Sequence, residues 1–180
     1  KVINSQIGID ILKKGGNAFD AMVATELALA VSYPSAGNIG GGGFMVFRKS
    51  DGTTGALDYR ERAPIKSTKD MYLDENGNII QGLSMVGGLS VGVPGTIAGI
   101  FEAHKKYGTL SVKEIISPVI ELAEKGVIIT ENQKNRIDEN RKYFKLVNKS
   151  VVPFDDDFET NEIITYPELA ITLKKIMENG

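Results

Sequence analysis

The sequence contains no cysteine and only one histidine. Without cysteine, the chain can form no disulfide framework, no thiolate nucleophile and no cysteine zinc site. A hydrolytic triad needs a base beside its nucleophile, and only His104 could supply an imidazole. We expect His104 to lie on the surface of a helix, and a single histidine offers no pair for a metal site. The composition therefore argues against histidine-based and metal-dependent catalysis.

The chain also lacks an excess of positive charge and a long apolar run. Lys and Arg number 21 against 23 Asp and Glu, a net charge of −2. Proteins that bind nucleic acid usually carry a basic face. The longest apolar stretch, residues 18–34, is interrupted by Asp20 and Glu26, whereas a membrane helix needs ~20 apolar residues. No signal peptide is visible at the start. We expect neither nucleic-acid binding nor a membrane span in this chain.

Two segments have a suggestive composition but the wrong pattern for a ligand loop. Gly40 to Gly43 lie between a predicted helix and a predicted strand, whereas a phosphate loop follows a strand and begins a helix. These glycines allow close approach of the backbone either to other backbone or to a ligand, and both interpretations stay open. Residues 155–157 are three aspartates without the spacing or glycine of a calcium loop.

The composition that is present predicts one globular domain over residues 1–180, because 42% of the residues are hydrophobic. Apolar periodicity and capping signals predict helices over the following ranges: 2–14, 18–32, 94–107, 112–125, 131–143 and 166–179. In this prediction Pro94 belongs to the first turn of its helix, and Thr165 caps the last helix together with Glu168. The helix over 18–32 is apolar nearly all round, so we expect neighbours on several sides.

A β-hairpin is predicted over residues 44–48 and 54–59, around a turn at Asp51 and Gly52. Residues 63–92 are predicted to be irregular, with a tight turn at Asn76 and Gly77. Residues 144–164 are predicted as loop with one short strand. A lone hairpin is marginal in water, so these strands are expected to belong to a larger sheet.

The segment from Asp58 to Pro64 holds the strongest candidate for binding. If the strand continues, Arg60 and Arg62 point to the same side and Glu61 to the other. The planar fork of arginine matches a carboxylate, so either arginine could hold an acidic ligand. A local Arg–Glu ion pair at the strand end is the alternative that spacing leaves open.

Four motifs, in order along the chain, resemble those of γ-glutamyltranspeptidases. They are Gly15-Gly16-Asn17-Ala18-Phe19-Asp20-Ala21, Asn38-Ile39-Gly40-Gly41-Gly42-Gly43-Phe44, Asp58-Tyr59-Arg60-Glu61-Arg62-Ala63-Pro64 and Gly92-Val93-Pro94-Gly95-Thr96. Phe19 and Met22 replace smaller residues common in the first motif, and we expect local repacking of the core. Beyond about residue 145 the match fades.

The resemblance implies an α/β (α+β) fold, the four-layer αββα sandwich of N-terminal-nucleophile hydrolases, of which this chain is a helix-rich part of the large subunit. It implies a precursor that cuts itself and a catalytic threonine on a small subunit, so the chain alone is expected to be inactive. The implied reaction moves the γ-glutamyl group of glutathione or a similar donor to an amino acid, a peptide or water, without metal or organic cofactor. The implied location is periplasmic, secreted or at the cell surface.

By the same resemblance, Arg60 grips the α-carboxylate of the donor, and the glycine run belongs to the core. No catalytic residue is expected in this chain. Three alternatives stay open: a cephalosporin acylase, an enzyme that processes poly-γ-glutamate capsules, and a non-catalytic homologue that acts as a binding module.

Overall fold

The computed structural model describes residues 2–148 and 153–179. The chain divides into two compact units. The first comprises Lys1–Glu61, Pro94–Val127 and Ile163–Gly180, and the second comprises Arg62–Val93 and Ile128–Glu162. That residues 1–180 form one domain stays a prediction.

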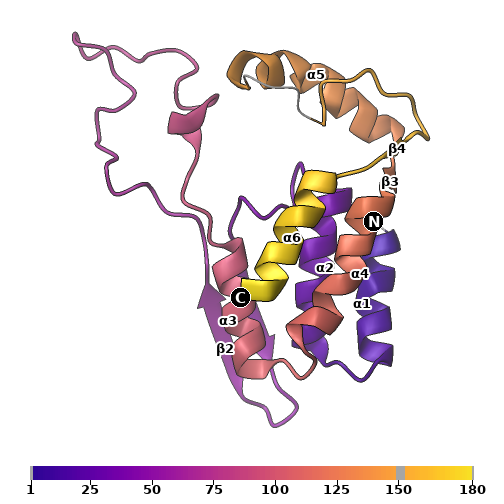
Figure 1. Ribbon diagram of the computed structural model, residues 1–180. Helices are drawn as coiled ribbons and strands as arrows, with labels where there is room; N and C mark the ends of the chain where they lie inside the picture. The colour runs from indigo at the N-terminus through magenta and orange to yellow at the C-terminus, as the bar shows by residue number, and fades with distance from the viewer. Residues whose placement is uncertain (1, 149–152, 180) are drawn as a thin grey trace. The chain divides into compact units, whose positions relative to one another are not determined.

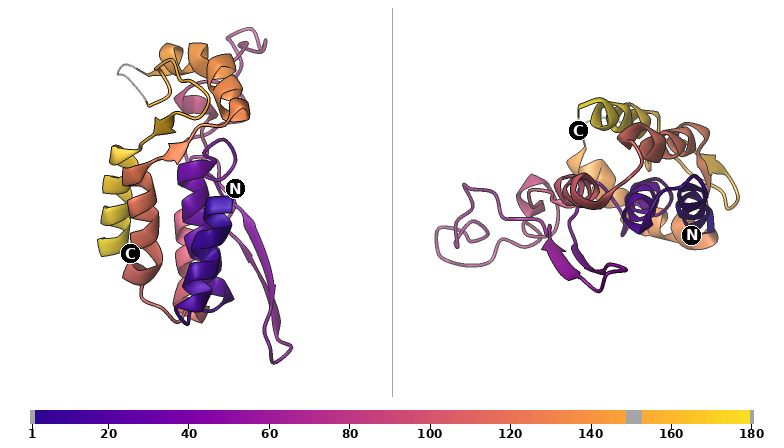
Figure 2. Two further views of the ribbon diagram at one scale, coloured as in Figure 1. Left: turned by 90° about the vertical axis from the view of Figure 1, so that its right-hand side faces the viewer. Right: turned by 90° about the horizontal axis from the view of Figure 1, so that it is seen from below.

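Five helices form the body of the first unit. They are α1 (Val2–Lys13), α2 (Ala18–Ser32), α3 (Thr96–Tyr107), α4 (Val112–Lys125) and α6 (Pro167–Asn179). Helix α2 packs against α1, α3 and α4, and α6 packs against α4, so these helices lie side by side (Figures 1 and 2). The prediction that α2 is covered on several sides is confirmed, since Leu27, Ala28 and Val31 are fully buried.

Local capping signals set where α2 and α4 begin. The side chain of Asn17 accepts hydrogen bonds from the first turn of α2, and the side chain of Asp20 accepts one from the Asn17 N–H. Ser111 and Glu114 form the same reciprocal pair at α4. Such capping boxes satisfy backbone donors that a helix start leaves unpaired. Glycine with a positive φ follows α4 at Gly126, as a helix end often requires.

Two predicted helix starts are wrong by one or two residues. Helix α3 begins at Thr96, not at Pro94, because the carbonyl oxygen of Gly41 accepts hydrogen bonds from Gly95 N and Thr96 N. Helix α6 begins at Pro167, and its first backbone bond runs from Ala170 N to Tyr166 O. This start lies one residue later than a cap by Thr165 requires. Proline in the first turn needs no donor partner, which suits this start.

A β-hairpin completes the first unit. Strand β1 (Phe44–Arg48) pairs antiparallel with β2 (Thr54–Asp58), from Phe44 opposite Asp58 to Arg48 opposite Thr54. Exposure alternates along both strands, as expected for a sheet with one covered face. On the covered face the Phe47 ring meets the rings of Phe19 and Tyr107, at centroid distances of 5.3 and 4.9 Å. Phe19 also stacks on Tyr107 at 4.7 Å, so the three rings form one aromatic cluster.

The second unit has less regular structure. Residues 63–92 are irregular as predicted, with a turn at Gly77 and a short 3₁₀ helix, η1 (Gly88–Ser90). Helix α5 (Glu131–Val147) starts at the predicted Thr130 cap and runs four residues beyond Tyr143. Two short strands lie where the chain passes from one unit to the other: β3 (Val127–Ile128) and β4 (Ile163–Ile164), of which β4 is the short strand expected in residues 144–164. Residues 149–152 of that expected loop lie outside the described residues.

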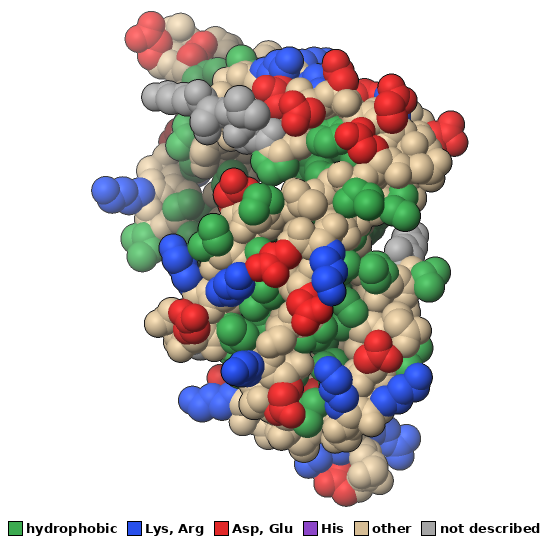
Figure 3. Space-filling model, turned by 45° about the vertical axis from the view of Figure 1, so that its right-hand side comes forward, with side chains coloured by type: hydrophobic (Ala, Val, Ile, Leu, Met, Phe, Trp, Pro, Cys, Tyr) green, Lys and Arg blue, Asp and Glu red, His purple; other side chains and the backbone are tan. Residues whose placement is uncertain are grey.

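Within the described residues, no helix is both long and apolar enough to cross a membrane. On the face drawn in Figure 3, lysine and arginine side chains are interspersed with acidic ones, and neither sign forms a continuous patch. Lys174 Nζ of α6 lies 2.6 Å from Glu124 Oε1 of α4, and this ion pair links two adjacent helices at the surface.

Candidate functional site

Arg60 follows the end of β2, and the hairpin ladder fixes its backbone. Beyond the last strand pair, Tyr59 N donates to Gly43 O at 3.0 Å and Gly43 N donates to Tyr59 O at 3.4 Å. Arg60 N donates to a carboxylate oxygen of Asp58 at 3.0 Å. Because side chains alternate along a strand, Arg60 follows Asp58 on the exposed face and Tyr59 follows Leu57 on the covered face. The backbone therefore directs Arg60 away from the helices of the first unit.

The Arg60 guanidinium is exposed and carries an uncompensated charge. Among residues 2–148 and 153–179, no acidic side chain lies within ion-pair distance of Arg60 or Arg62, and Glu61 pairs with no base. The predicted alternative, a local Arg–Glu ion pair, does not form. The strand also stops at Asp58, while Arg62 bonds through its backbone to Val93. The prediction that Arg60 and Arg62 point to the same side required the strand to continue through both residues, and it does not.

Glycines bring three chain segments together beside Arg60. A Cβ added at Gly42 would lie 2.5 Å from Glu61 N, far inside van der Waals contact. One added at Gly95 would overlap the carbonyl oxygen of Tyr59. We call residues 41–43, 59–61 and 95 the glycine junction. The close approach is between backbone segments, so of the two open interpretations of the glycine run the structure supports a packed junction.

His104 occupies a different environment from the one expected. It is largely buried, and its Nε2 atom donates to Leu110 O at 2.9 Å and lies 3.5 Å from Asp20 Oδ1. The expectation of a helix-surface residue is wrong, because the turn after α3 folds back over the ring. The Thr109 hydroxyl donates to Asp20 at 2.6 Å and not to the histidine. A nucleophile would need its hydroxyl on the imidazole, so this arrangement is not a triad.

Asp20 is completely buried and accepts hydrogen bonds from the backbone of Asn17, Thr109 and Leu110. Burial opposes its ionisation, but the bonds from Thr109, Asn17 and Leu110 together outweigh burial and lower the pKa of the carboxyl. We call Asn17, Asp20, His104, Thr109 and Leu110 the Asp20 cluster. Its role is to join the start of α2 to the turn between α3 and α4.

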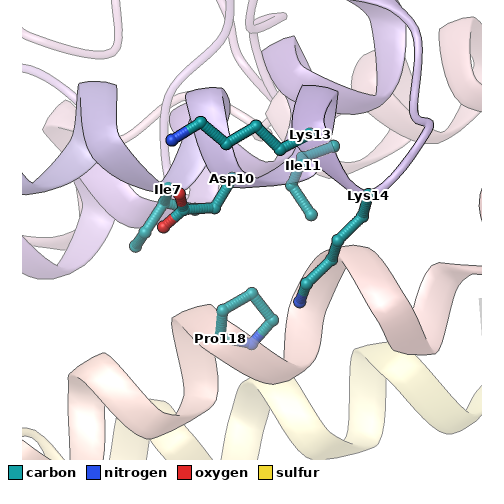
Figure 4. A pocket seen from close by; sticks show the side chains of 6 residues that line it. All are labelled: Ile7, Asp10, Ile11, Lys13, Lys14 and Pro118. Carbon is teal, nitrogen blue, oxygen red and sulfur yellow. The ribbon is translucent and has the colours of Figure 1, made fainter.

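A hollow in the first unit lies between α1 and α4 and has a volume of about 340 Å³. Figure 4 shows side chains of α1 and its C-terminal end on one side and Pro118 of α4 on the other. Its polar groups are two lysines and Asp10, whose carboxylate accepts a bond from Gln6 at 2.8 Å. None of the predicted site residues lines it. The described part of the chain also holds no cluster of three or more His, Asp or Glu side chains that could bind a metal ion.

Sequence reasoning identified Arg60 but missed the residues that hold it. Tyr59 and Gly99 were not singled out, and Gly95 was noted only within a motif. Gly99 lies inside an otherwise ordinary helix pattern, where a glycine is unfavourable by roughly 0.5–1 kcal/mol relative to alanine. That cost was the only available signal of a close neighbour.

Comparison with known proteins gives consistent results over the whole chain. The family model described as gamma-glutamyltranspeptidase matches residues 4–180. A glutathione hydrolase proenzyme from Pseudomonas sp. (strain A14) is 44% identical over 182 residues, covering 99% of this chain and 32% of that protein. The crystal structure of Helicobacter pylori gamma-glutamyltranspeptidase matches with a TM-score of 0.92 and 44% identity, covering 97% of this chain and 51% of that one.

A more distant match helps to separate the alternatives. Cephalosporin acylase from Bacillus halodurans matches with a TM-score of 0.82 and 31% identity, covering 98% of this chain and 34% of that one. The structural matches confirm the predicted fold class, an α/β fold of the N-terminal-nucleophile hydrolase type, represented here by a helix-rich part. The chain spans about a third of the length of the curated relative.

Proposed function

The chain belongs to the γ-glutamyltranspeptidase family, and from this premise we propose that it is the donor-binding part of an enzyme that transfers or hydrolyses γ-glutamyl groups. The donor is glutathione or a similar γ-glutamyl compound, and the acceptor is an amino acid, a peptide or water. The proposed reaction is completed by a small subunit from the same proenzyme. We also infer a periplasmic, secreted or cell-surface location, as the family resemblance implies.

The observation that carries the proposal is the Arg60 guanidinium. It is exposed, it has no acidic partner among the described residues, and a packed junction holds the backbone that carries it. A guanidinium presents two parallel N–H groups that match the two oxygens of a carboxylate. Held by its α-carboxylate, a glutamyl group extends its γ-carbonyl away from the clamp. Such orientation converts binding into a correctly placed reacting bond.

The chemistry needs a nucleophile that this chain does not supply. In the proposed mechanism a threonine at the start of the small subunit attacks the γ-carbonyl, and its own α-amine takes the hydroxyl proton. The proton passes to the leaving amine as the amide bond breaks, which leaves a γ-glutamyl ester on the threonine. An acceptor amine or water then attacks the ester and releases the threonine. No histidine is required, in agreement with the structural role of His104.

Relative similarity favours γ-glutamyl chemistry over the acylase alternative. Identity is 44% to the Helicobacter pylori transpeptidase and 31% to the Bacillus halodurans acylase. The two activities differ in the substrate's α-amino acid head, since a glutaryl group has a carboxylate there but no amine. We expect the assembled enzyme to hydrolyse γ-glutamyl-p-nitroanilide faster than glutaryl-p-nitroanilide. A preference for the glutaryl substrate would favour the acylase.

Arg60→Ala in the assembled enzyme tests the proposal directly. A charge-assisted hydrogen bond contributes roughly 1.5–3 kcal/mol, so we expect KM for γ-glutamyl-p-nitroanilide to rise roughly 10- to 100-fold. Arg48→Ala is the matched control, because Arg48 is an exposed arginine at the other end of the same hairpin. An unchanged KM and kcat in Arg60→Ala would refute the role of this residue.

The non-catalytic alternative makes a different prediction about the whole protein. If the protein is an enzyme, the full-length product splits into two chains, and the second begins with threonine. Mass spectrometry of the purified protein detects both features. An uncleaved product that binds γ-glutamyl compounds without turning them over would support a binding module.

A further inference from the structure

Tyr59 precedes Arg60 directly and lies on the opposite, covered face of the hairpin. We propose that Tyr59 is a positioning residue for donor binding: glycines grip its ring and its carbonyl group, and this grip sets where the Arg60 guanidinium lies. The inference rests on the proposed function, because it assigns Tyr59 a role only if Arg60 holds the donor. It adds a determinant of carboxylate recognition that does not itself touch the substrate.

The ring of Tyr59 lies in a slot that only glycine leaves open. A Cβ added at Gly99, in the buried first half of α3, would overlap the first ring atom, Cγ. On the opposite segment, a Cβ added at Gly43 would lie 2.9 Å from Tyr59 Cε2 and 3.0 Å from the hydroxyl oxygen. Contacts below 3.0 Å force one of the partners to move, and at Gly99 that partner is the base of the ring and not its free end. We call Gly43, Gly95 and Gly99 the Tyr59 slot.

The main chain of Tyr59 is held as tightly as its ring. Its N–H and carbonyl bond to Gly43, and the same carbonyl faces Gly95 at a distance that excludes any side chain there. The Arg60 carbonyl also lies 3.1 Å from the position of a Cβ on Gly95. One peptide unit therefore connects the gripped ring on one face with the exposed guanidinium on the other. Because the unit is planar and stiff, displacement of Tyr59 moves the Arg60 backbone with it.

The Tyr59 ring is neutral. A tyrosine phenol is protonated at neutral pH, and burial and the negative charge of Glu26 on α2 raise the pKa of the Tyr59 phenol further. Burial also raises the pKa of the Glu26 carboxyl. A neutral ring fits an apolar slot between glycines, where a phenolate would be poorly solvated. Tyr59 therefore acts through its shape and not through its charge.

A misplaced guanidinium weakens recognition of one group on the substrate, the α-carboxylate. Displacement of about 1 Å can cost on the order of 10²-fold in rate when geometry governs the reaction. The α-carboxylate is absent from 4-aminobutyryl-p-nitroanilide, which otherwise equals γ-glutamyl-p-nitroanilide. The ratio of kcat/KM for γ-glutamyl-p-nitroanilide to that for 4-aminobutyryl-p-nitroanilide therefore reports on the Arg60 contact, while general damage to the enzyme lowers both values together.

Gly99→Ala in the assembled enzyme is the decisive variant. Alanine favours a helix more than glycine does, so helix α3 itself is not weakened. The added Cβ pushes on the Tyr59 ring, and we expect the ratio of kcat/KM to fall at least tenfold, chiefly through KM for the γ-glutamyl substrate. Gly88→Ala is the matched control, because an added Cβ there meets nothing within 4 Å. An unchanged ratio in Gly99→Ala would overturn the proposal.

Two variants of Tyr59 keep the test valid if Gly99→Ala does not fold. Tyr59→Ala empties the slot without a clash, and we expect the same selective fall in the ratio, whereas Tyr59→Phe keeps the ring and stays near wild type. Equal losses on both substrates in Tyr59→Ala would contradict positioning.

Arg60→Ala, measured beside these variants, separates the two ideas. If Arg60→Ala leaves the ratio unchanged, the proposed donor-binding role of Arg60 fails and the role of Tyr59 fails with it. If Arg60→Ala lowers the ratio but Tyr59→Ala does not, donor binding by Arg60 stands and positioning by Tyr59 is wrong.

Discussion

The charged groups of Asp20 and Arg60 differ in burial and in the partners that compensate their charge. Asp20 is fully buried, and backbone and hydroxyl donors from two separate segments satisfy its carboxylate. Arg60 is exposed and has no acidic partner in the described residues. A buried charge is tolerated only when its partners are complete, and removing it leaves those partners unsatisfied. An exposed, unpaired charge contributes little to folding and stays free for a ligand.

The largest effect on stability is therefore expected for Asp20→Ala. The change leaves the N–H groups of Asn17, Thr109 and Leu110 without their acceptor inside the protein, and we expect a loss of about 3 kcal/mol in the free energy of unfolding. Urea unfolding of the full-length protein measures it. Asp10→Ala is the control, because Asp10 is exposed on α1. Similar losses in both variants would remove the distinction between buried and exposed charge.

Acid should weaken the Asp20 cluster. Because hydrogen bonds lower the folded-state pKa of Asp20, its contribution is fully present above the unfolded value of about 3.9 and is lost as pH falls through the lower folded value. Unfolding free energies of wild type and Asp20→Asn, measured from pH 7 to 2, should converge below about pH 4. A constant difference over that range would show that ionisation of Asp20 does not contribute.

A smaller loss is expected at the cap of α2. Asn17 Oδ1 accepts bonds from Phe19 N and Asp20 N, and its Nδ2 donates to Tyr107 O at 2.6 Å. Removing an N-cap typically costs about 1 kcal/mol, so Asn17→Ala should lower stability by that amount or slightly more. Asn140→Ala, at an exposed site on α5, should change it by less than about 0.5 kcal/mol in the same unfolding assay. If Asn17→Ala lost more stability than Asp20→Ala, the Asn17 cap and not the buried Asp20 carboxylate would contribute most to the stability of this region.

These two regions also show what a sequence can reveal. The starts of α2, α4 and α5 were predictable because each cap pairs residues three positions apart. The start of α3 was missed because its first donors bond to Gly41, which comes from a distant segment. Burial of His104 depends in the same way on a turn that folds back over it. Local signals fix elements, while contacts between distant segments shift their ends and decide burial.

In the candidate site, too, one part could be predicted from a local motif and the other depends on contacts between distant segments. Arg60 was identified from its motif because a resemblance assigns its role without geometry. The Tyr59 slot and its ring bring together the residue before β1, the residue after β2 and the start of α3, and no spacing pattern places those three segments side by side. The only local trace was a glycine inside a helix, and a helix can contain glycine without any close neighbour. A position such as Gly99 therefore becomes interpretable only when its neighbours in space are known.

The smallest stability effect completes the comparison. Arg60→Ala should change the free energy of unfolding by less than about 0.5 kcal/mol, because the exposed guanidinium has no partner to lose among the described residues. Without ligand, wild type and Arg60→Ala should therefore be almost equally stable, but added glutamate should make wild type the more stable of the two. Glutamate at 100 times its dissociation constant stabilises a binding protein by about 2.7 kcal/mol. Thermal unfolding of wild type should therefore shift upward with added glutamate, while Arg60→Ala shifts less at the same concentration. If both proteins respond equally, the α-carboxylate is held by another group, and the exposed charge of Arg60 has no role in recognition.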